Sequence, residues 1–340
     1  MVAGCEERCM NFLLPVGERK GLALVAFALA GMLASGTASA QAWPTRPVRM
    51  VIPFPAGGAL DTVGRVTALA LTERLGQQVI VDNRGGASGA IGAAEVARAS
   101  ADGYTLAFAS SDTFTILPLL RKDLPFDVNK DFTPVAKVAD MYMLLSVHPK
   151  FAAQSLAELI EMAKAKPGEL RYASVGNGTV HHITFEYFNA LAGTKIAHIP
   201  FKGGSAATTA AMGGHVEVLI SGINIFKTVQ AGQLRALAVA KATRSNLLPS
   251  VPTLIESGFP DFIAASWFGV LGPLGLPEAI TNRLSTEIAA ITAMPEFQQR
   301  VAAVGGEPGA LGQKEFIQHW ARDMQRWRKI VETTKIRLDE

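Results

Sequence analysis

Four turns rich in glycine, serine and other small residues could bind a small anion in this chain. Small residues leave the backbone N–H groups accessible, and a helix N-terminus adds the positive end of its dipole, so a carboxylate can bind the main chain directly. The candidate ligand-binding residues are Pro55, Ala56, Gly57, Gly58, Asp61, Ser110, Ser111, Asp112, Ser174, Gly176, Asn177, Gly178, Thr179, His181, Phe201, Lys202 and Gly203. The pattern predicts binding of a small organic carboxylate.

Two charged candidates have a second interpretation. Asp61 either caps the helix expected to begin near it or accepts a hydrogen bond from a ligand amine or hydroxyl, and both remain open because Asp is a favoured N-cap residue. Lys202 either attracts the anion or is simply solvated, which is the common state of lysine.

Motifs for catalysis and cofactor binding are missing from the sequence. It contains no G-x-S-x-G elbow, no Walker A sequence and no H-E-x-x-H. Residues 176–181 resemble the start of a dinucleotide fingerprint, but His181 stands where the third glycine would allow close packing. His181 and the adjacent His182 would point about 100° apart on a helix, which does not suit one metal ion. We therefore expect no catalytic residue, no metal and no cofactor.

His198 and His215 lie near expected strand edges without a carboxylate cluster at metal-ligand spacing. We interpret both as surface histidines.

The elements that position the turns follow a βα rhythm, in which short aliphatic runs alternate with Ala- and Leu-rich segments. Such units predict mostly parallel sheets. The expected strands are 48–54, 78–81, 104–109, 170–174, 196–201, 216–221, 234–240 and 267–271. The expected helices are 61–75, 89–99, 155–165, 179–192, 206–212, 277–292 and 314–336.

Two segments could connect separate domains. Residues 134–147 read as one extended segment longer than a usual strand, and 248–263 have the Pro and Gly density of a connector. We expect lobe 1 to comprise residues 41–140 and 250–340, and lobe 2 to comprise 141–249. The candidate turns would then lie at the carboxyl ends of parallel strands, where ligands of open α/β sheets bind.

Composition supports a two-domain globular protein. The 340 residues are 49% hydrophobic and 18% charged, which is enough to bury a large core. The net charge is only +3, and no basic stripe interleaved with aromatic residues occurs. Nucleic acid is therefore not an expected partner.

Residues 1–40 have the order of a secretory signal peptide. Arg19 and Lys20 precede an apolar run at 21–34, and Ala-Ser-Ala at 38–40 matches an A-x-A cleavage site. The run is shorter than the roughly 20 residues that cross a bilayer. We expect cleavage after residue 40.

Both cysteines, Cys5 and Cys9, precede the apolar run, and Met10 is an alternative start. The mature chain would contain no disulfide and no lipid-modified cysteine. We expect a periplasmic monomer without a lipid anchor.

Five motifs in a fixed order carry a resemblance to a known family. They are Pro-Phe-Pro-Ala-Gly-Gly-Ala-Leu-Asp at 53–61, Val-Asp-Asn-Arg-Gly-Gly-Ala-Ser-Gly-Ala-Ile-Gly at 81–92, Ala-Asp-Gly-Tyr-Thr-Leu at 101–106, Tyr-Ala-Ser-Val-Gly-Asn-Gly-Thr-Val-His-His at 172–182 and Ile-Pro-Phe-Lys-Gly at 199–203. From about residue 43 to its end, the chain resembles the Bug family, the extracytoplasmic solute receptors of tripartite tricarboxylate transporters.

The resemblance implies a periplasmic binding-protein fold of type II, with two doubly wound α/β lobes joined by hinge strands and a ligand cleft between them. It also implies that the lobes close around a small organic carboxylate or dicarboxylate and deliver it to integral membrane permease subunits. Thr179 and Phe201 replace the Ser and Tyr common in the family, and Asp112 departs from the usual Ser-Thr pair. Asp112 would favour a cationic or hydroxylated ligand group.

Two other functions remain as alternatives. A secreted α/β hydrolase would use Ser174 as nucleophile with a nearby base such as His181, but lacks the strained elbow. A ligand sensor that signals to a membrane protein would share the binding step and differ in its docking partner.

Overall fold

The computed structural model describes residues 43–336, and the part from Arg46 onward forms one compact unit. The expected signal peptide at 1–40, with Cys5 and Cys9, lies outside the described residues. Within residues 43–336, no helix combines the length and the apolar character needed to cross a membrane.

Ten strands of this unit form one mixed sheet, in which the order of the main path is β2-β1-β3-β9-β4-β7-β5-β6. β8 and β10 pair with β4 outside this path. The strands are β1 (Val48–Ile52), β2 (Val79–Asn83), β3 (Thr105–Ser110), β4 (Phe132–Val147), β5 (Arg171–Ser174), β6 (Ala197–Pro200), β7 (Val218–Gly222), β8 (Arg235–Val239), β9 (Ala265–Pro273) and β10 (Glu307–Leu311).

Parallel pairing is confined to two groups of three strands, β2-β1-β3 and β6-β5-β7. β9 pairs antiparallel with β3 and β4, and β4 pairs antiparallel with β7, β8 and β10. The expectation of mostly parallel strands is therefore wrong for the centre of the sheet. The physical reason is that β4 carries the chain from the first group to the second and β9 carries it back, so these strands must run in opposite directions.

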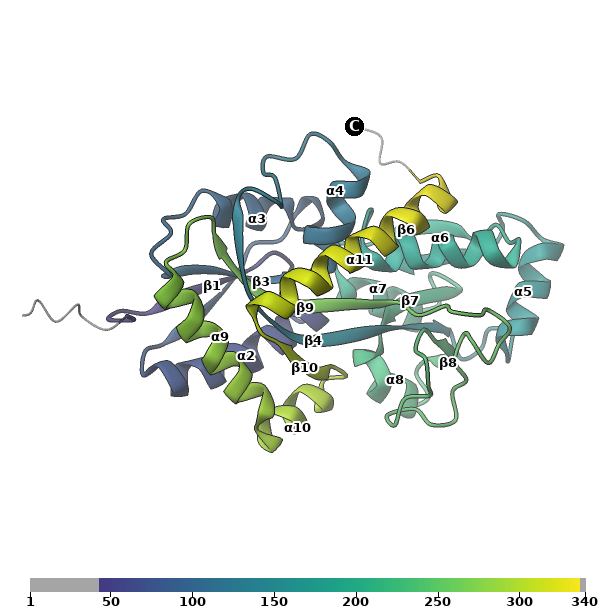
Figure 1. Ribbon diagram of the computed structural model, residues 1–340. Coiled ribbons are helices and arrows are strands. Elements are labelled where there is room, and N and C mark those ends of the chain that lie inside the picture. The colour runs from purple at the N-terminus through teal and green to yellow at the C-terminus, as the bar shows by residue number, and fades with distance from the viewer. Residues whose placement is uncertain (1–42, 337–340) are drawn as a thin grey trace, which may run out of the picture. The chain divides into compact units, whose positions relative to one another are not determined.

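Each parallel group is the centre of an α/β lobe. We call the part around β2-β1-β3 lobe 1 and the part around β6-β5-β7 lobe 2. One long strand belongs to both, because β4 pairs with β9 from Phe132 to Tyr142 and with β7 from Met143 to Val147. In Figure 1, β4 and β9 run through the middle of the ribbon between the two groups of helices.

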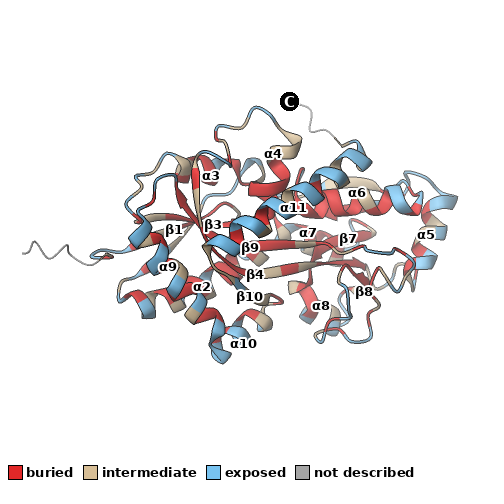
Figure 2. Cartoon of the chain, viewed as in Figure 1, coloured by how far each residue is buried: buried red, intermediate tan, exposed pale blue. Residues whose placement is uncertain are grey.

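The helices pack on the faces of these strands. They are α2 (Ala59–Leu75), α3 (Ala90–Ala97), α4 (Leu117–Leu120), α5 (Leu156–Ala165), α6 (Val180–Ala192), α7 (Gly204–Met212), α8 (Phe226–Gln230), α9 (Glu278–Ala293), α10 (Pro295–Ala303) and α11 (Gln313–Thr334), with 3-10 turns η1 (Ala87–Gly89) and η3 (Ile223–Ile225) and a π-helical turn η2 (Asp112–Ile116). Figure 2 shows the central strands buried, while α9, α10 and α11 expose one side to solvent.

Most expected elements are present with shifts of a few residues at their ends, and several short ones were not anticipated. The sequence did not predict η2, α4, η3, α8, α10 or β10. Most of these are too short for a helical or alternating hydrophobic period to develop. Among the elements that the sequence did not predict, the π-helical turn η2 matters most, because it begins at Asp112 and positions that residue.

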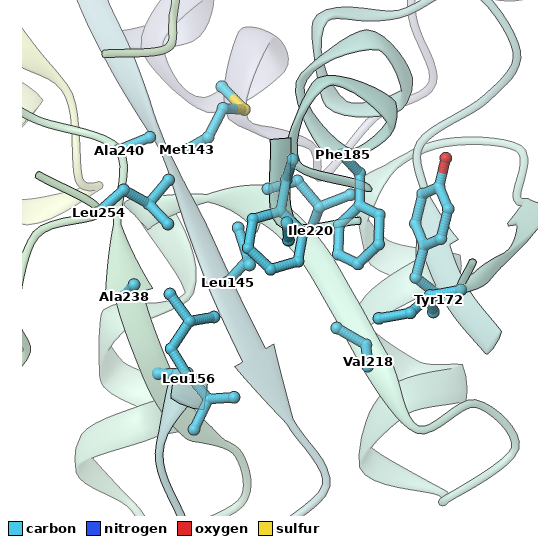
Figure 3. Packing of buried hydrophobic residues seen from close by; sticks show 14 of the residues in the cluster. Met143, Leu145, Leu156, Tyr172, Phe185, Val218, Ile220, Ala238, Ala240 and Leu254 are labelled. Carbon is cyan, nitrogen blue, oxygen red and sulfur yellow. The ribbon is translucent and has the colours of Figure 1, made fainter. Parts of the chain in front are cut away.

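The core of lobe 2 also includes residues beyond the expected lobe boundary. Leu254, Phe259 and Phe262 belong to the same buried cluster as Leu145 of β4 and Tyr172 of β5. Figure 3 shows Leu254 and Leu145 together with other members of this cluster. The Pro- and Gly-rich segment that contains these residues therefore packs against lobe 2.

Helix α11 packs against both lobes. Its Phe316 and Trp320 belong to the buried cluster that contains Phe114, whereas Trp327 belongs to the cluster of lobe 2. The apolar side of this helix is therefore part of two cores.

Candidate functional site

The turn after β1 presents uncapped backbone groups. The N-cap residue of α2 is Gly58, and no side chain caps this end. Gly57 has φ +83°, and a Cβ there would stand 3.2 Å from Ser205 Oγ of lobe 2, so the turn and the close approach both require glycine. The first amides of α2 are thus open to an anion.

Asp61 shapes this turn from within the helix. Its carboxylate accepts hydrogen bonds from Gly57 N at 2.9 Å, from Arg65 Nε at 3.0 Å and from Asn83 Nδ2 at 2.9 Å. Burial raises the pKa of Asp61, but the bonds from Arg65, Gly57 and Asn83 outweigh it and hold the pKa below the ordinary value. Gly58, and not Asp61, is therefore the N-cap of α2, and these donors occupy the Asp61 carboxylate.

The turn after β3 carries a buried carboxylate. Asp112 begins the π-helical turn η2 and is 5% exposed. Its Oδ2 accepts a hydrogen bond from Ser266 Oγ at 2.9 Å, and Ser111 Oγ lies 3.0 Å from the same serine hydroxyl. Its Oδ1 accepts a hydrogen bond from Val180 N of α6 at 2.9 Å. Asp112 therefore links β9 and lobe 2 to the end of β3.

Ionisation of Asp112 is favoured despite this burial. Burial raises the pKa of its carboxyl, but the electrostatic effect of the His181 ring and the bonds from Val180 N and Ser266 outweigh burial and lower the pKa. His181 Nδ1 stands 3.7 Å from Asp112 Oδ1, which is beyond hydrogen-bond distance, so this contact is electrostatic. The group is a carboxylate at neutral pH.

The turn after β5 leads into α6. Thr179 is the N-cap of this helix and accepts a hydrogen bond from His182 N at 3.4 Å. Thr179 Oγ1 also donates to Gly176 O at 2.8 Å, so this residue orders the turn. The helix end is capped twice, by Thr179 from its own chain segment and by Asp112 from lobe 1.

Ser174 has a different partner from the one that the hydrolase alternative requires. Its Oγ lies 2.6 Å from His198 Nε2, whereas His181 lies by Asp112. Burial, with a smaller effect of the stacked His182 ring, lowers the pKa of His198 to about 3. His198 is partly buried in this pair, so the interpretation of it as a surface histidine is wrong, whereas His215 is exposed. Tertiary packing of α6 on β6 is what covers the ring.

The turn after β6 offers a second uncapped helix end. Gly203 is the N-cap of α7 and has no side-chain capping bond. Lys202 beside it is exposed, which agrees with the solvated interpretation. The amide end of α7 therefore faces the turn after β1, because Pro55 approaches the Gly203 position from lobe 1.

An inner cavity of about 60 Å³ lies between these turns. Fourteen of its lining residues are not among the expected site residues, and these are Phe54, Ala59, Leu60, Met141, Met143, Val175, Gly204, Thr208, Ser221, Gly222, Asn224, Ile225, Ser266 and Phe268. The expected site residues that line it are Pro55, Gly58, Ser110, Asp112, His181 and Gly203. Many of the unexpected residues come from β4, β7 and β9, where an apolar strand sequence gives no sign of which side chain faces a ligand.

An open outer groove of about 1260 Å³ adjoins the inner cavity and shares Phe54, Pro55, Val175 and Gly203 with it. The expected site residues in its lining are Pro55, Gly176, Asn177, Phe201, Lys202 and Gly203. The remaining candidates line neither space, and these are Ala56, Gly57, Asp61, Ser111, Ser174, Gly178 and Thr179.

Three buried polar atoms of the inner cavity lack a hydrogen-bond partner. They are Ser110 Oγ, His181 Nδ1 and Ser221 Oγ. Buried polar groups are almost always paired in native proteins, so orphan atoms on a cavity wall mark positions that a ligand or water satisfies. The cavity has the character of a small-molecule site, with apolar walls and a few polar groups.

Hydrogen bonds across the cleft hold the two lobes together around this space. Ser88 Oγ donates to Asn177 O at 2.5 Å, and Ser205 Oγ donates to Gly57 O at 3.2 Å. With the bond from Val180 N to Asp112, they describe a closed arrangement of the turns.

Among residues 43–336, no group of three or more His, Cys, Asp or Glu side chains is arranged to hold a metal ion.

Comparisons with known proteins identify the family. Residues 63–336 match the model of the tripartite tricarboxylate transporter family receptor, TctC. The protein BugT of Bordetella pertussis is 35% identical over 319 residues, which are 93% of this chain and 98% of BugT. A UPF0065 protein of Bordetella bronchiseptica is 37% identical over 302 residues, covering 88% of this chain and 89% of that protein.

Solved structures agree with this match. Rpa4515 of R. palustris, determined with adipate, superposes with a TM-score of 0.84 at 34% identity over 87% of this chain and 99% of that one. MatC of Rhodopseudomonas palustris, determined with bound malate, superposes with a TM-score of 0.79 at 28% identity over 85% and 100% of the two chains. The chain therefore belongs to the TctC receptor family, the Bug-type periplasmic solute-binding proteins, which are receptors and not enzymes.

Proposed function

We propose that this protein captures a small organic carboxylate in the inner cavity and delivers it to the membrane permease subunits of a tripartite tricarboxylate transporter. The observation that carries the proposal is the convergence of two uncapped helix ends, those of α2 and α7, on a cavity with orphan polar atoms. Backbone amides at helix N-termini bind carboxylates without a basic side chain. Relatives determined with adipate and malate support this ligand class.

The site would have two parts. Backbone groups of Gly58 and Gly203, at the N-caps of α2 and α7, would bind the carboxylate, and Ser110 and His181 would contact the rest of the ligand. Asn177, Phe201 and Lys202, in the outer groove, would contact the ligand during entry. Seven other candidates would hold the turns in place, namely Ala56, Gly57, Asp61, Ser111, Ser174, Gly178 and Thr179. Pro55 and Gly176 would form part of the groove wall.

The lobes would close and open about the strands that connect them. The expected division is 41–140 with 250–340 for lobe 1 and 141–249 for lobe 2. The change of the pairing partner of β4 from β9 to β7 after Tyr142 supports the first crossing. Packing of Leu254, Phe259 and Phe262 in the lobe 2 core supports a return crossing at the start of β9, later than residue 250.

The protein would act as a monomer in the periplasm, after cleavage of residues 1–40 and without a lipid anchor. N-terminal sequencing of the protein from a periplasmic extract tests this directly. A first residue other than Gln41, or recovery in the membrane fraction, would contradict it.

A thermal-shift screen of the chain from Gln41 onward tests the binding function. The ligands are mono-, di- and tricarboxylates, with the amide of each acid as its matched control. A ligand at a hundredfold its dissociation constant stabilises the fold by about 2.7 kcal/mol. We expect a shift with an acid that its amide does not produce. Equal shifts with acid and amide, or no shift with any acid, would contradict carboxylate capture.

A further inference from the structure

The wall of the inner cavity has an unusual charge. Its lining contains no Lys and no Arg, and its only carboxylate is that of Asp112. A cavity built for two carboxylates would be expected to avoid a fixed negative charge, since like charges at close range repel.

Asp112 is held so that it can accept further hydrogen bonds. Val180 N and Ser266 Oγ each donate one bond to a different carboxylate oxygen. An ionised carboxylate has about four lone-pair positions, so acceptor capacity remains on both oxygens. The two donors are neutral, and no Lys or Arg within the cavity lining pairs with the charge.

A buried carboxylate is costly unless it is paired or hydrogen-bonded. His181 Nδ1, at 3.7 Å from Asp112, has no hydrogen-bond partner, so this pair is not closed by the protein alone. The Asp112 carboxylate can therefore accept a further hydrogen bond from a positively charged donor. A ligand ammonium group has both properties.

The helix N-termini around the cavity indicate where the carboxylate of the ligand binds. Asp112 already occupies the N-terminal amide of α6 at Val180, so an anion from the ligand has no access to that amide. The N-termini of α2 and α7 carry no side-chain cap and remain for one carboxylate. The orphan hydroxyls of Ser110 and Ser221, both at least nine-tenths buried, mark the same cavity as a ligand site.

We propose that Asp112 is a specificity-determining residue that binds the ammonium group of a small zwitterionic amino acid, whose carboxylate lies at the N-termini of α2 and α7. Met141, Met143 and Phe268 would enclose its apolar part. The same carboxylate discriminates against dicarboxylates, because their second negative charge would meet Asp112. This inference rests on the proposed carboxylate-binding function and names the ligand class of that site.

Isothermal titration calorimetry on the mature chain with matched ligands tests the inference. Each small amino acid is compared with the acid that lacks its amine, with the 2-hydroxy acid and with the dicarboxylate of the same length. An example is alanine, propionate, lactate and malonate. We expect at least one amino acid to bind about 30-fold or more tightly than its three matched ligands. A buried charge that is left unpaired lowers affinity by this order of magnitude.

Variants separate specificity from structure. Asp112→Asn keeps an acceptor for Val180 N and removes the charge. We expect it to lose about 30-fold or more in affinity for the amino acid and to keep or gain affinity for the other three ligands. Asp323→Asn, at a partly buried aspartate outside the cavity lining, is the matched control and should bind as the parent does.

The outcomes are distinguishable. Binding of dicarboxylates in preference to amino acids by the parent protein overturns the inference and leaves the receptor function intact. Equal binding of the hydroxy acid and the amino acid also overturns it, in favour of a hydroxyl subsite. An equal loss for all four ligands in Asp112→Asn assigns Asp112 a purely structural role. Failure of every acid to bind overturns the proposed function itself.

Discussion

Asp112 Oδ1 accepts a hydrogen bond of 2.9 Å from Val180 N, so a residue at the end of β3 in lobe 1 caps the first turn of α6 in lobe 2. A helix N-terminus normally finds this partner within its own chain segment, as α6 also does in Thr179. The second cap forms only when the two turns meet. In the proposed mechanism, it would couple closure of the cleft to the chemistry of the ligand site.

We expect closure to depend also on Ser88. Its Oγ donates to Asn177 O at 2.5 Å across the outer groove. Ser88→Ala removes this bond from the closed form, so we expect ligand affinity to fall about 2- to 10-fold, the effect of one hydrogen bond. Ser155→Ala is the control, because it removes the N-cap of α5 and should lower stability without changing affinity. Isothermal titration calorimetry measures the ligand affinity of both variants. Equal losses of affinity in the two variants would mean that Ser88 acts on the fold and not on closure.

Gly57 combines a left-handed backbone with a contact between the lobes. Its φ is +83°, and a Cβ would approach Ser205 Oγ to 3.2 Å. Gly57→Ala should destabilise the fold by about 1 kcal/mol and also weaken ligand binding. Gly76, with φ +67° and nothing within 4 Å, provides the matched control. In urea unfolding, Gly76→Ala should lose a similar free energy of unfolding, and its ligand affinity should be unchanged. A parallel loss of affinity in both variants would rule out an effect specific to the cleft.

Asp323 should make the protein less stable at neutral pH than an uncharged residue would. Burial is the main cause that raises its pKa from 3.8 to about 6. The folded state then holds the proton more tightly than the unfolded state, so this contribution to stability is present below pH 4 and is lost as pH rises through 6. Partial contact with solvent limits the cost to about 2 kcal/mol.

Asp323→Asn should therefore unfold at a higher urea concentration than the parent at pH 7.5, with no difference at pH 4. Trp267 Nε1, which donates to Asp323 Oδ2 at 3.0 Å, keeps an acceptor in this variant. Asp261→Asn, at an exposed aspartate, is the control for any removal of charge. A variant that is equally destabilised at both pH values would show that the charge is not the cause.

His198 should have the opposite pH dependence. Burial, with a smaller effect of His182, lowers its pKa from 6.5 to about 3, so the folded state binds its proton less readily than the unfolded chain does. This contribution to stability is present above pH 6.5 and is lost as pH falls toward 3. At pH 5 the loss is about 1–2 kcal/mol, discounted for the partly exposed ring.

His198→Gln keeps a hydrogen-bonding group near Ser174 and removes the titration. We expect its urea midpoint to fall less than that of the parent between pH 7 and pH 5. His215→Gln, at an exposed histidine, should follow the parent. If all three proteins lose the same stability, His198 is not the acid-sensitive group.

The sequence by itself determined the repeating βα units and the turns that carry the site. Residues 53–61 and 174–179 combine small residues with a helix start, and local conformational preferences are enough to predict uncapped or side-chain-capped helix ends there. Ser155 before α5 and Gly76 after α2 mark helix boundaries for the same local reason.

Only the tertiary structure decided which residues line the cavity. Met143 pairs with Gly222, and Ser221 pairs with Leu144, where β4 meets β7. Which side chains of these strands face the cleft depends on how the two distant segments meet. Asp112 meets Val180 from 68 positions away in the sequence. His198 is covered because α6 packs beside β6, not because of its neighbours in the chain. Hydrophobic period and turn chemistry act over a few residues, whereas the site depends on contacts between segments that the chain brings together only after folding.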